Sequence, residues 1–171
     1  MMRKLLLVTG IAVLTAHIGA ARAQTQFDIS GTIEPGTCEW VVGDDDKKIL
    51  FDPIDVSVFP AAGGAGFKTF TLGLRNCTPS LTSATFVFSG TSDVSDVIRF
   101  GNGGTAGGVA VELESSDGST IAADGSNSSR TVLVTSGNAV IQLRAGYWRV
   151  GARPLTSGTV SSVALVSVSY H

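Results

Sequence analysis

Histidine, the usual general base of a nucleophilic triad, is scarce in this sequence. The only two histidines are His17, inside an apolar run near the start, and His171, the last residue. A Ser/His/Asp triad would therefore lack a well-held general base. Glu112 and Glu114 share one face of an expected strand and could work as a carboxylate pair, but neighbouring acids on an exposed face are ordinarily just solvated. The sequence indicates no enzyme.

Three further groups suggest binding chemistry. The aspartates at positions 44–46 could bind calcium, but they lack the spacing of a calcium loop and are better explained as a charged hairpin tip. The glycine-rich residues 101–108 lack the Gly-Lys-Ser/Thr ending of a phosphate loop, so we expect a flexible connection. Trp40, Tyr147 and Trp148 could line a sugar site, although such residues more often fill a sandwich core or cap an edge. No metal or cofactor is predicted.

The first 23 residues have the pattern of a secretory signal. Arg3 and Lys4 give a positive start, residues 5–16 an apolar run, and residues 21–23 (Ala-Arg-Ala) a small-x-small cleavage site. The apolar run is too short to cross a bilayer. We therefore expect an exported mature chain that begins at Gln24.

Export changes the charge of the chain and the state of its cysteines. Loss of three basic residues leaves nine basic and 14 acidic residues, a net charge of −5, with no basic stripe for nucleic acid. Cys38 and Cys77 are the only cysteines, and an oxidising compartment favours a disulfide between them. Closing that loop stabilises the fold by about 4 kcal/mol in the loop-entropy model. The length suits one domain with a modest core.

The most regular stretch of the mature chain lies near its start, over residues 27–33. Strict alternation puts Phe27, Ile29 and Ile33 on one face of an extended strand, with Gly31 in the same row. No hairpin partner lies next to this strand in the sequence. Its apolar face must therefore be buried somewhere other than in a local turn.

Short alternating segments separated by turn residues fill the rest of the chain. Residues 94–100 are ambiguous between a strand and a short helical turn, and no sustained helical period appears. This spacing predicts an antiparallel β-sandwich. Strands are expected over residues 39–42, 47–51, 68–74, 85–88, 109–113, 131–134, 139–145 and 159–171, the last with Ala164, Val166, Val168 and Tyr170 on one face.

Several of these features recur in one order along the whole mature chain. They are the alternating strand with Gly31 at its middle, Cys38 soon after it, Asn76-Cys77, the strand at residues 108–113 leading to Asp117-Gly118, Ala145-Gly146-Tyr147, and the penultimate Tyr170. In this order and spacing they resemble chaperone-usher pilus subunits of the type 1 pilin-like kind. The resemblance implies an all-β fold: an incomplete immunoglobulin-like β-sandwich that lacks its last strand, with an N-terminal donor-strand extension.

The resemblance also assigns roles to residues. A missing last strand leaves a hydrophobic groove beside the C-terminal strand, and the extension of a neighbouring subunit fills it. Pro35 cannot donate a ladder hydrogen bond, so pairing of the extension must stop by about Glu34. The implied donor residues are Phe27, Ile29, Gly31 and Ile33, and the implied groove edge and chaperone contact is formed by Ala164, Val166, Val168 and Tyr170.

The expected organisation is a signal peptide at residues 1–23, a donor-strand extension at 24–36 and a pilin domain at 37–171. The implied function is that of a structural subunit of a surface fimbria, exported through the periplasm and supporting adhesion or biofilm formation. The implied partners are other pilus subunits, a periplasmic chaperone and an outer-membrane usher, with host or surface glycans as targets of the assembled fibre. The alternative is a secreted carbohydrate- or receptor-binding β-sandwich module.

Overall fold

The structure is a computed structural model that describes residue 30 and residues 36–61, 63–151 and 153–171. From Gly36 onward these residues belong to one compact unit, Glu34–His171. The expected signal peptide and the expected donor residues Phe27, Ile29, Gly31 and Ile33 lie outside the described residues.

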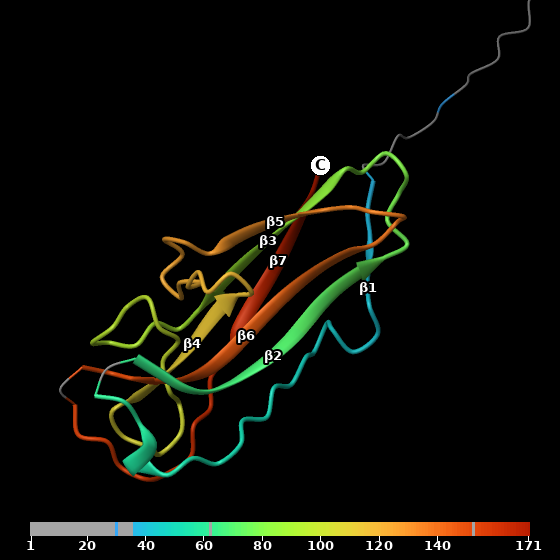
Figure 1. Cartoon of the computed structure of the whole chain (residues 1–171). Helices are drawn as coiled ribbons and strands as arrows, with labels where there is room; N and C mark the ends of the chain where they lie inside the picture. Colours follow the sequence, from blue (N-terminus) through green and yellow to red (C-terminus); the bar gives the residue numbers. More distant parts are fainter. Residues whose placement is uncertain (1–29, 31–35, 62, 152) are drawn as a thin grey trace, which may run out of the picture. The chain divides into compact units, whose positions relative to one another are not determined.

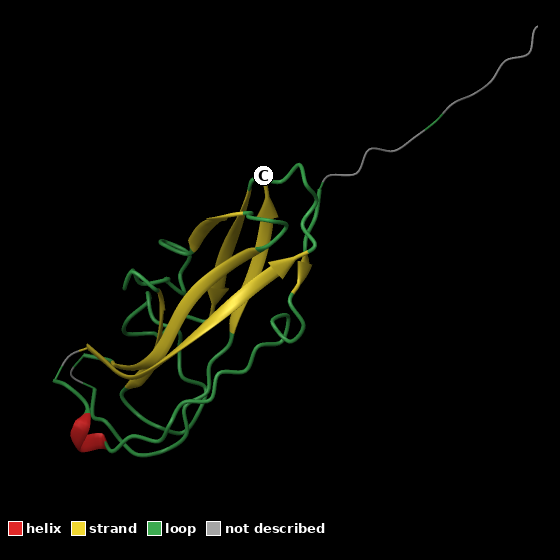
Figure 2. Cartoon of the chain, turned by 45° about the vertical axis from the view of Figure 1, so that its right-hand side comes forward, coloured by secondary structure: helices red, strands yellow, loops and turns green. Residues whose placement is uncertain are grey.

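The described residues form two antiparallel sheets, with strand orders β1-β2-β6-β4 and β5-β3-β7 (Figure 1). Apart from one short 3-10 helix, these residues contain only strands and loops (Figure 2). The expected all-β sandwich is confirmed. Within the described ranges, no helix has the length and apolar character needed to cross a membrane. The elements are β1 (Glu39–Trp40), η1 (Val56–Val58), β2 (Gly63–Arg75), β3 (Ser83–Gly90), β4 (Val109–Ser115), β5 (Ser129–Leu133), β6 (Ala139–Arg149) and β7 (Ala164–Tyr170).

The core lies between the two sheets and is made by alternate residues of the strands. On β3, Phe86 and Phe88 are almost fully buried, whereas their outward neighbours are partly exposed. They belong to the same apolar cluster as Leu74 of β2 and Leu143 of β6. Alternation in the sequence therefore identified the inward faces correctly, because side chains of a strand point to opposite faces in turn.

The segment after β1 differs from the expected strand-turn-strand arrangement. Residues 47–51 belong to no strand, although Phe51 packs against the core. Asp44 is buried, accepts a hydrogen bond from the Gly73 amide at 2.8 Å and pairs with Lys47 at 2.6 Å. The expected hairpin tip at positions 44–46 is therefore wrong for its first residue, which binds the backbone of β2.

A disulfide joins Cys38 and Cys77, as the sequence predicted, and holds their Cα atoms 4.0 Å apart. Cys38 precedes β1 directly, and Cys77 follows β2, the strand with which β1 pairs. The two-residue strand β1 is thus held covalently at one end. It is far shorter than an ordinary strand, so its own ladder contributes little.

The first prediction concerns this disulfide. Reduction should lower the free energy of unfolding by about 4 kcal/mol, because the unfolded chain regains the entropy of an open loop of 39 residues. Guanidinium unfolding with and without reductant measures the difference. A Cys38→Ala/Cys77→Ala variant should match the reduced protein and ignore the reductant. A loss below about 1 kcal/mol would contradict the argument.

Candidate functional site

The outer edge of β7 has no partner strand among the described residues, because the second sheet ends in the order β3-β7. His171 and Ser83 exchange two backbone hydrogen bonds, each of 3.0 Å. In an antiparallel ladder, mutually bonded residues alternate with residues whose amide and carbonyl groups face the other way. Pairing with β3 therefore leaves the backbone groups of four residues directed at the free edge: Ala164, Val166, Val168 and Tyr170.

The same four positions carry the inward side chains of β7. Val166, Val168 and Tyr170 pack against the core cluster but remain only partly buried, and Ala164 is exposed. The corresponding inward residues of the neighbouring strand β3 are almost completely buried. The edge of β7 therefore exposes apolar side chains and backbone hydrogen-bonding groups together. The structure places the four sequence-predicted groove residues in one row along this edge.

The edge of the other sheet lies close by. Trp40 on β1 and Phe51 after it are partly buried and pack against the core, and the Trp40 ring meets Phe86 edge-on with centroids 6.0 Å apart. The Tyr170 hydroxyl donates to the Cys38 carbonyl oxygen at 3.4 Å. Because this bond joins the start of β1 to the end of β7, both free edges lie on the same side of the sandwich. Partly exposed apolar side chains line the two edges.

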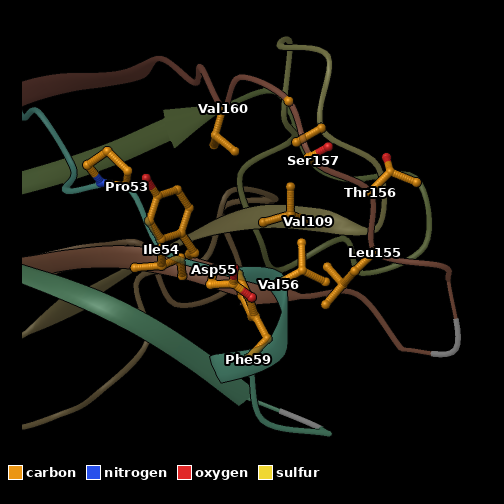
Figure 3. A pocket seen from close by; sticks show the side chains of 13 residues that line it. Pro53, Ile54, Asp55, Val56, Phe59, Val109, Leu155, Thr156, Ser157 and Val160 are labelled. Carbon is orange, nitrogen blue, oxygen red and sulfur yellow. The ribbon is translucent and has the colours of Figure 1, made fainter.

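A cavity of about 290 Å³ lies between the segments that extend these two edges (Figure 3). Ile54, Val56 and Phe59 line it from the chain that follows β1, and Leu155 and Val160 line it from the chain that leads into β7. The lining is largely aliphatic and aromatic, so the cavity suits an apolar side chain better than a charged group.

Tyr147 of β6 also lines the cavity and holds one wall in place. Its ring contacts Phe51 and Phe59 in edge-on geometry, with centroid distances of 4.9 and 6.1 Å. Its hydroxyl donates to the carbonyl oxygen of Asp52 at 3.1 Å. The sequence placed this residue in a family motif and suggested a sugar site, a core or an edge cap, but did not reveal its contact with the chain after β1.

On the opposite side of the sandwich, the hydrogen bonds of one arginine join the two sheets. Arg130 of β5 donates from Nε to the Ser115 hydroxyl at the end of β4, at 2.9 Å. Its two terminal nitrogens donate to backbone oxygens of the intervening loop, including those of Ser119, Thr120 and Asn127. One arginine thus joins β5 to β4 across the gap between the sheets. The free edge of β7 lies on the other side, next to the start of β1.

The carboxylate pair considered in the sequence is not exposed, contrary to expectation. Glu112 is 1% exposed and Glu114 is 7% exposed, because loops cover the outer face of β4. Glu112 pairs with Arg99 at 2.9 Å and accepts a hydrogen bond from the Thr120 hydroxyl at 2.9 Å. Glu114 pairs separately with Arg144 of β6. Each carboxylate pairs with a different arginine, so both belong to a buried cluster of charged side chains.

Burial dominates the titration of Glu112. It raises the pKa of this carboxyl from 4.5 to about 7, against the opposing effects of the Thr120 hydroxyl and the Arg99 charge. The guanidinium group of Arg99 also lies 3.7 Å from the ring centre of Trp148, whose indole nitrogen donates to Asp96 at 3.0 Å. A cation above an aromatic face is attracted by the ring quadrupole. The cluster therefore fixes the loop that carries Arg99 against the sheet.

The remaining candidates for binding chemistry do not form a site. Trp40, Tyr147 and Trp148 occupy three separate packing environments and present no common surface for a sugar. Among the residues described, no group of three or more His, Cys, Asp or Glu side chains is placed to hold a metal ion.

Comparison with known proteins identifies the chain. A family model described as Fimbrial protein matches residues 27–171, and the S-fimbrial adhesin protein SfaS of Escherichia coli strain 536 is 31% identical over 99% of this chain and 98% of its own length. The chain belongs to the fimbrial protein family. It is a structural subunit of a bacterial fimbria on the cell surface, where its partners are other pilus subunits. The resemblance seen in the sequence is confirmed.

Solved structures show that this fimbrial protein has the pilin fold. The P pilus rod subunit PapA is similar with a TM-score of 0.66 and 23% identity, over 78% of this chain and 99% of its own. A subunit of a chaperone-usher pilus matches with a TM-score of 0.67 and 19% identity, over 92% of this chain and 100% of its own. A type I fimbria protein of Burkholderia pseudomallei matches with a TM-score of 0.58 and 26% identity, over 78% of this chain and 88% of its own.

The second prediction concerns the pH dependence of the fimbrial subunit. A carboxyl whose pKa is raised in the folded state favours folding when protonated, so its contribution is complete below about pH 4.5 and is lost as the pH rises through about 7. Glu112→Gln cannot titrate. Relative to wild type, its free energy of unfolding should therefore increase by at least about 1 kcal/mol between pH 4.5 and pH 8.

Urea unfolding of both proteins at several pH values measures this difference. Asp55→Asn serves as the control, because Asp55 is exposed and its pKa is lowered by hydrogen bonds from Ser57. If the Glu112→Gln variant instead loses stability relative to wild type as the pH rises, the ion pair with Arg99 outweighs burial and the argument is wrong.

Proposed function

We propose that the free edge of β7 receives the donor strand of another copy of this chain, and that residues 27–33 of this chain serve the next copy in turn. The observation that supports this most directly is the row formed by Ala164, Val166, Val168 and Tyr170. Its backbone groups and its apolar side chains are open along the same edge. Addition of a strand would satisfy both at once, since main-chain bonds give affinity and alternate side chains give register.

The expected donor segment has the complementary pattern. Phe27, Ile29 and Ile33 fall on one face of an extended strand, spaced like the inward residues of β7. Each large apolar side chain buried in this way contributes roughly 1.5–3 kcal/mol before ordering costs. Gly31 in the same row lets the strand approach closely where the groove is shallow.

Donation by one end of the chain into an edge elsewhere on the next chain joins subunits head to tail. Such a contact uses two different surfaces, so it repeats without closing and produces a fibre. An exposed edge of this kind also needs cover before assembly, because unpaired strand edges promote aggregation. We therefore propose that a periplasmic chaperone covers the edge after export, and that an outer-membrane usher exchanges it for the donor strand.

In this proposal the protein works without catalysis or cofactor. Residues 1–23 direct export, residues 24–36 form the donor extension and residues 37–171 form the acceptor domain. The assembled fibre serves adhesion or biofilm formation, with surface glycans as candidate targets. The description of the relative SfaS as a fimbrial adhesin supports the adhesive role.

The third prediction tests strand uptake directly. A fluorescent peptide of residues 24–34, in excess over the mature chain, should bind slowly and form a complex that survives gel filtration. A Gly31→Leu peptide should fail, because its new side chain occupies the space that the close approach requires. Fluorescence anisotropy follows the binding.

A Ser30→Leu peptide is the matched control, since it adds the same bulk to the opposite face of the strand and should still bind. Absence of binding by the natural peptide would refute the proposed function. Equal binding of the Gly31→Leu peptide would refute the role given to Gly31.

The fourth prediction tests the acceptor edge. Val168→Asp should weaken uptake of the peptide at least about 100-fold, because the donor strand would bury an unpaired carboxylate. Ser167→Asp places the same charge on the outward face of the adjacent residue and should change uptake little. Circular dichroism confirms that both variants fold. Uptake that falls equally in the two variants would show that the charge alone, and not the groove, is responsible.

A further inference from the structure

The glycine-rich loop at residues 101–107 is bound tightly to the segment that precedes β7. The side-chain oxygen of Asn102 accepts hydrogen bonds from the amides of Gly104 and Ser161, at 2.8 and 2.9 Å. Its side-chain nitrogen donates to the carbonyl oxygen of Ala106 at 2.9 Å. One asparagine therefore shapes the loop and links it to the chain 59 residues further on.

Two threonines form a reciprocal pair beside it. The Thr105 amide donates to the Thr159 hydroxyl at 3.1 Å, and the Thr159 amide donates to the Thr105 hydroxyl at 2.9 Å. Backbone bonds continue the contact: Ala106 donates to the Thr159 carbonyl at 3.0 Å, and Gly103 donates to the Ser161 carbonyl at 2.8 Å. Residues 156–161 belong to no strand, and the loop provides backbone hydrogen-bond partners for them.

The glycines of the loop allow this close approach. A Cβ atom on Gly104 would lie 2.1 Å from the Thr159 carbonyl oxygen, far inside contact distance. Gly108, directly after the loop, has φ +69°, and a Cβ on it would lie 2.5 Å from the Pro154 carbonyl oxygen. The flexible connection expected from the sequence is therefore wrong. The glycines are required by packing against the neighbouring segment, and the loop is fixed.

The segment held by the loop is one wall of the cavity in Figure 3. Thr156, Ser157, Gly158 and Val160 line this cavity, and Ala106 of the loop lines it as well. The same segment continues directly into the free edge of β7. The opposite wall of the cavity belongs to residues 53–59. Before a donor strand binds, the position of residues 156–161 therefore depends on their hydrogen bonds to the loop.

We propose that the loop at residues 101–107 is a positioning element that keeps the cavity and the start of β7 in the shape that accepts a donor strand. This inference rests on the proposed function. A site that is already formed binds without first ordering its wall, whereas a site formed only in a fraction of molecules binds more weakly by that fraction. The association rate, and not the dissociation rate, should carry the effect.

Asn102→Ala tests the proposal, because it removes both acceptor bonds and leaves the cavity lining unchanged. In the mature chain, association of the fluorescent peptide of residues 24–34 should slow roughly tenfold if the receptive conformation falls to about a tenth. Dissociation should change less than about twofold. Asn138→Ala is the matched control, since its side chain donates only within a hairpin, to the Ser136 carbonyl oxygen at 2.9 Å.

A second variant, Thr159→Val, tests the same contact in case Asn102→Ala does not fold. Thr159→Val keeps the volume of the side chain but removes the hydroxyl that accepts from the Thr105 amide. It should also slow association, and hydrogen exchange at the amides of Thr105 and Gly104 should become faster in the unbound protein. These amides report opening of the loop separately from global unfolding.

The outcomes separate the two levels of the argument. If wild type takes up the peptide and both variants associate at the wild-type rate, the positioning role is overturned while the proposed function stands. A change confined to dissociation, or to the melting temperature, would also overturn it, because a purely structural contact produces that result. If wild type takes up no peptide, the proposed function itself fails and this inference fails with it.

Discussion

The structure depends on one constraint: among the residues that the structure describes, no strand pairs with the outer edge of β7, and β7 covers the core beneath it only partly. Backbone amides and carbonyls at a sheet edge are hydrogen-bonding groups that require partners. In β7 these groups belong to the residues whose side chains also face the core, Val166, Val168 and Tyr170. Backbone groups without a partner strand and apolar side chains that are only partly buried therefore belong to the same row of residues. A single added strand would pair these backbone groups and cover these side chains at the same time.

The rest of the domain supports this opening and does not close it. The disulfide fixes the short strand β1 at the other margin, and the Tyr170 hydroxyl bridges the two margins at one end. On the far side, Arg130 joins β5 to β4. The buried pair of Arg99 and Glu112 fastens a loop onto the outer face of β4. These contacts connect the two sheets and their loops around the edge where the fibre contact is proposed.

Sequence patterns predicted the strands well because alternation is a local property. The inward residues of β3 and the row on β7 were correct, since a period of two assigns faces without reference to the partner. Burial of Glu112 was missed because alternation identifies a face but not the loop that covers it. The fixed loop around Gly104 was missed for a similar reason: glycine indicates freedom in an isolated chain, whereas here it permits contact with Thr159. The last strand was expected to begin at residue 159, but β7 begins five residues later, at Ala164. Thr159 and Ser161 pair with the loop at residues 101–107 and not with β3.

The same alternation that makes an edge receptive also determines the register of what it accepts. A slip of one residue would turn Asp28, Ser30 and Thr32 of the proposed donor towards the core and leave its apolar row in water. A slip of two would keep the faces but move Gly31 to a place where a large side chain fits, and bring Ile29 or Ile33 to the place where only glycine fits. In the proposed complex, register would therefore be specified twice, by the face of the donor strand and by the size of its side chains. A cavity wall held in position by the loop at residues 101–107 strengthens the second criterion, because a wall that yields would accept a misplaced side chain.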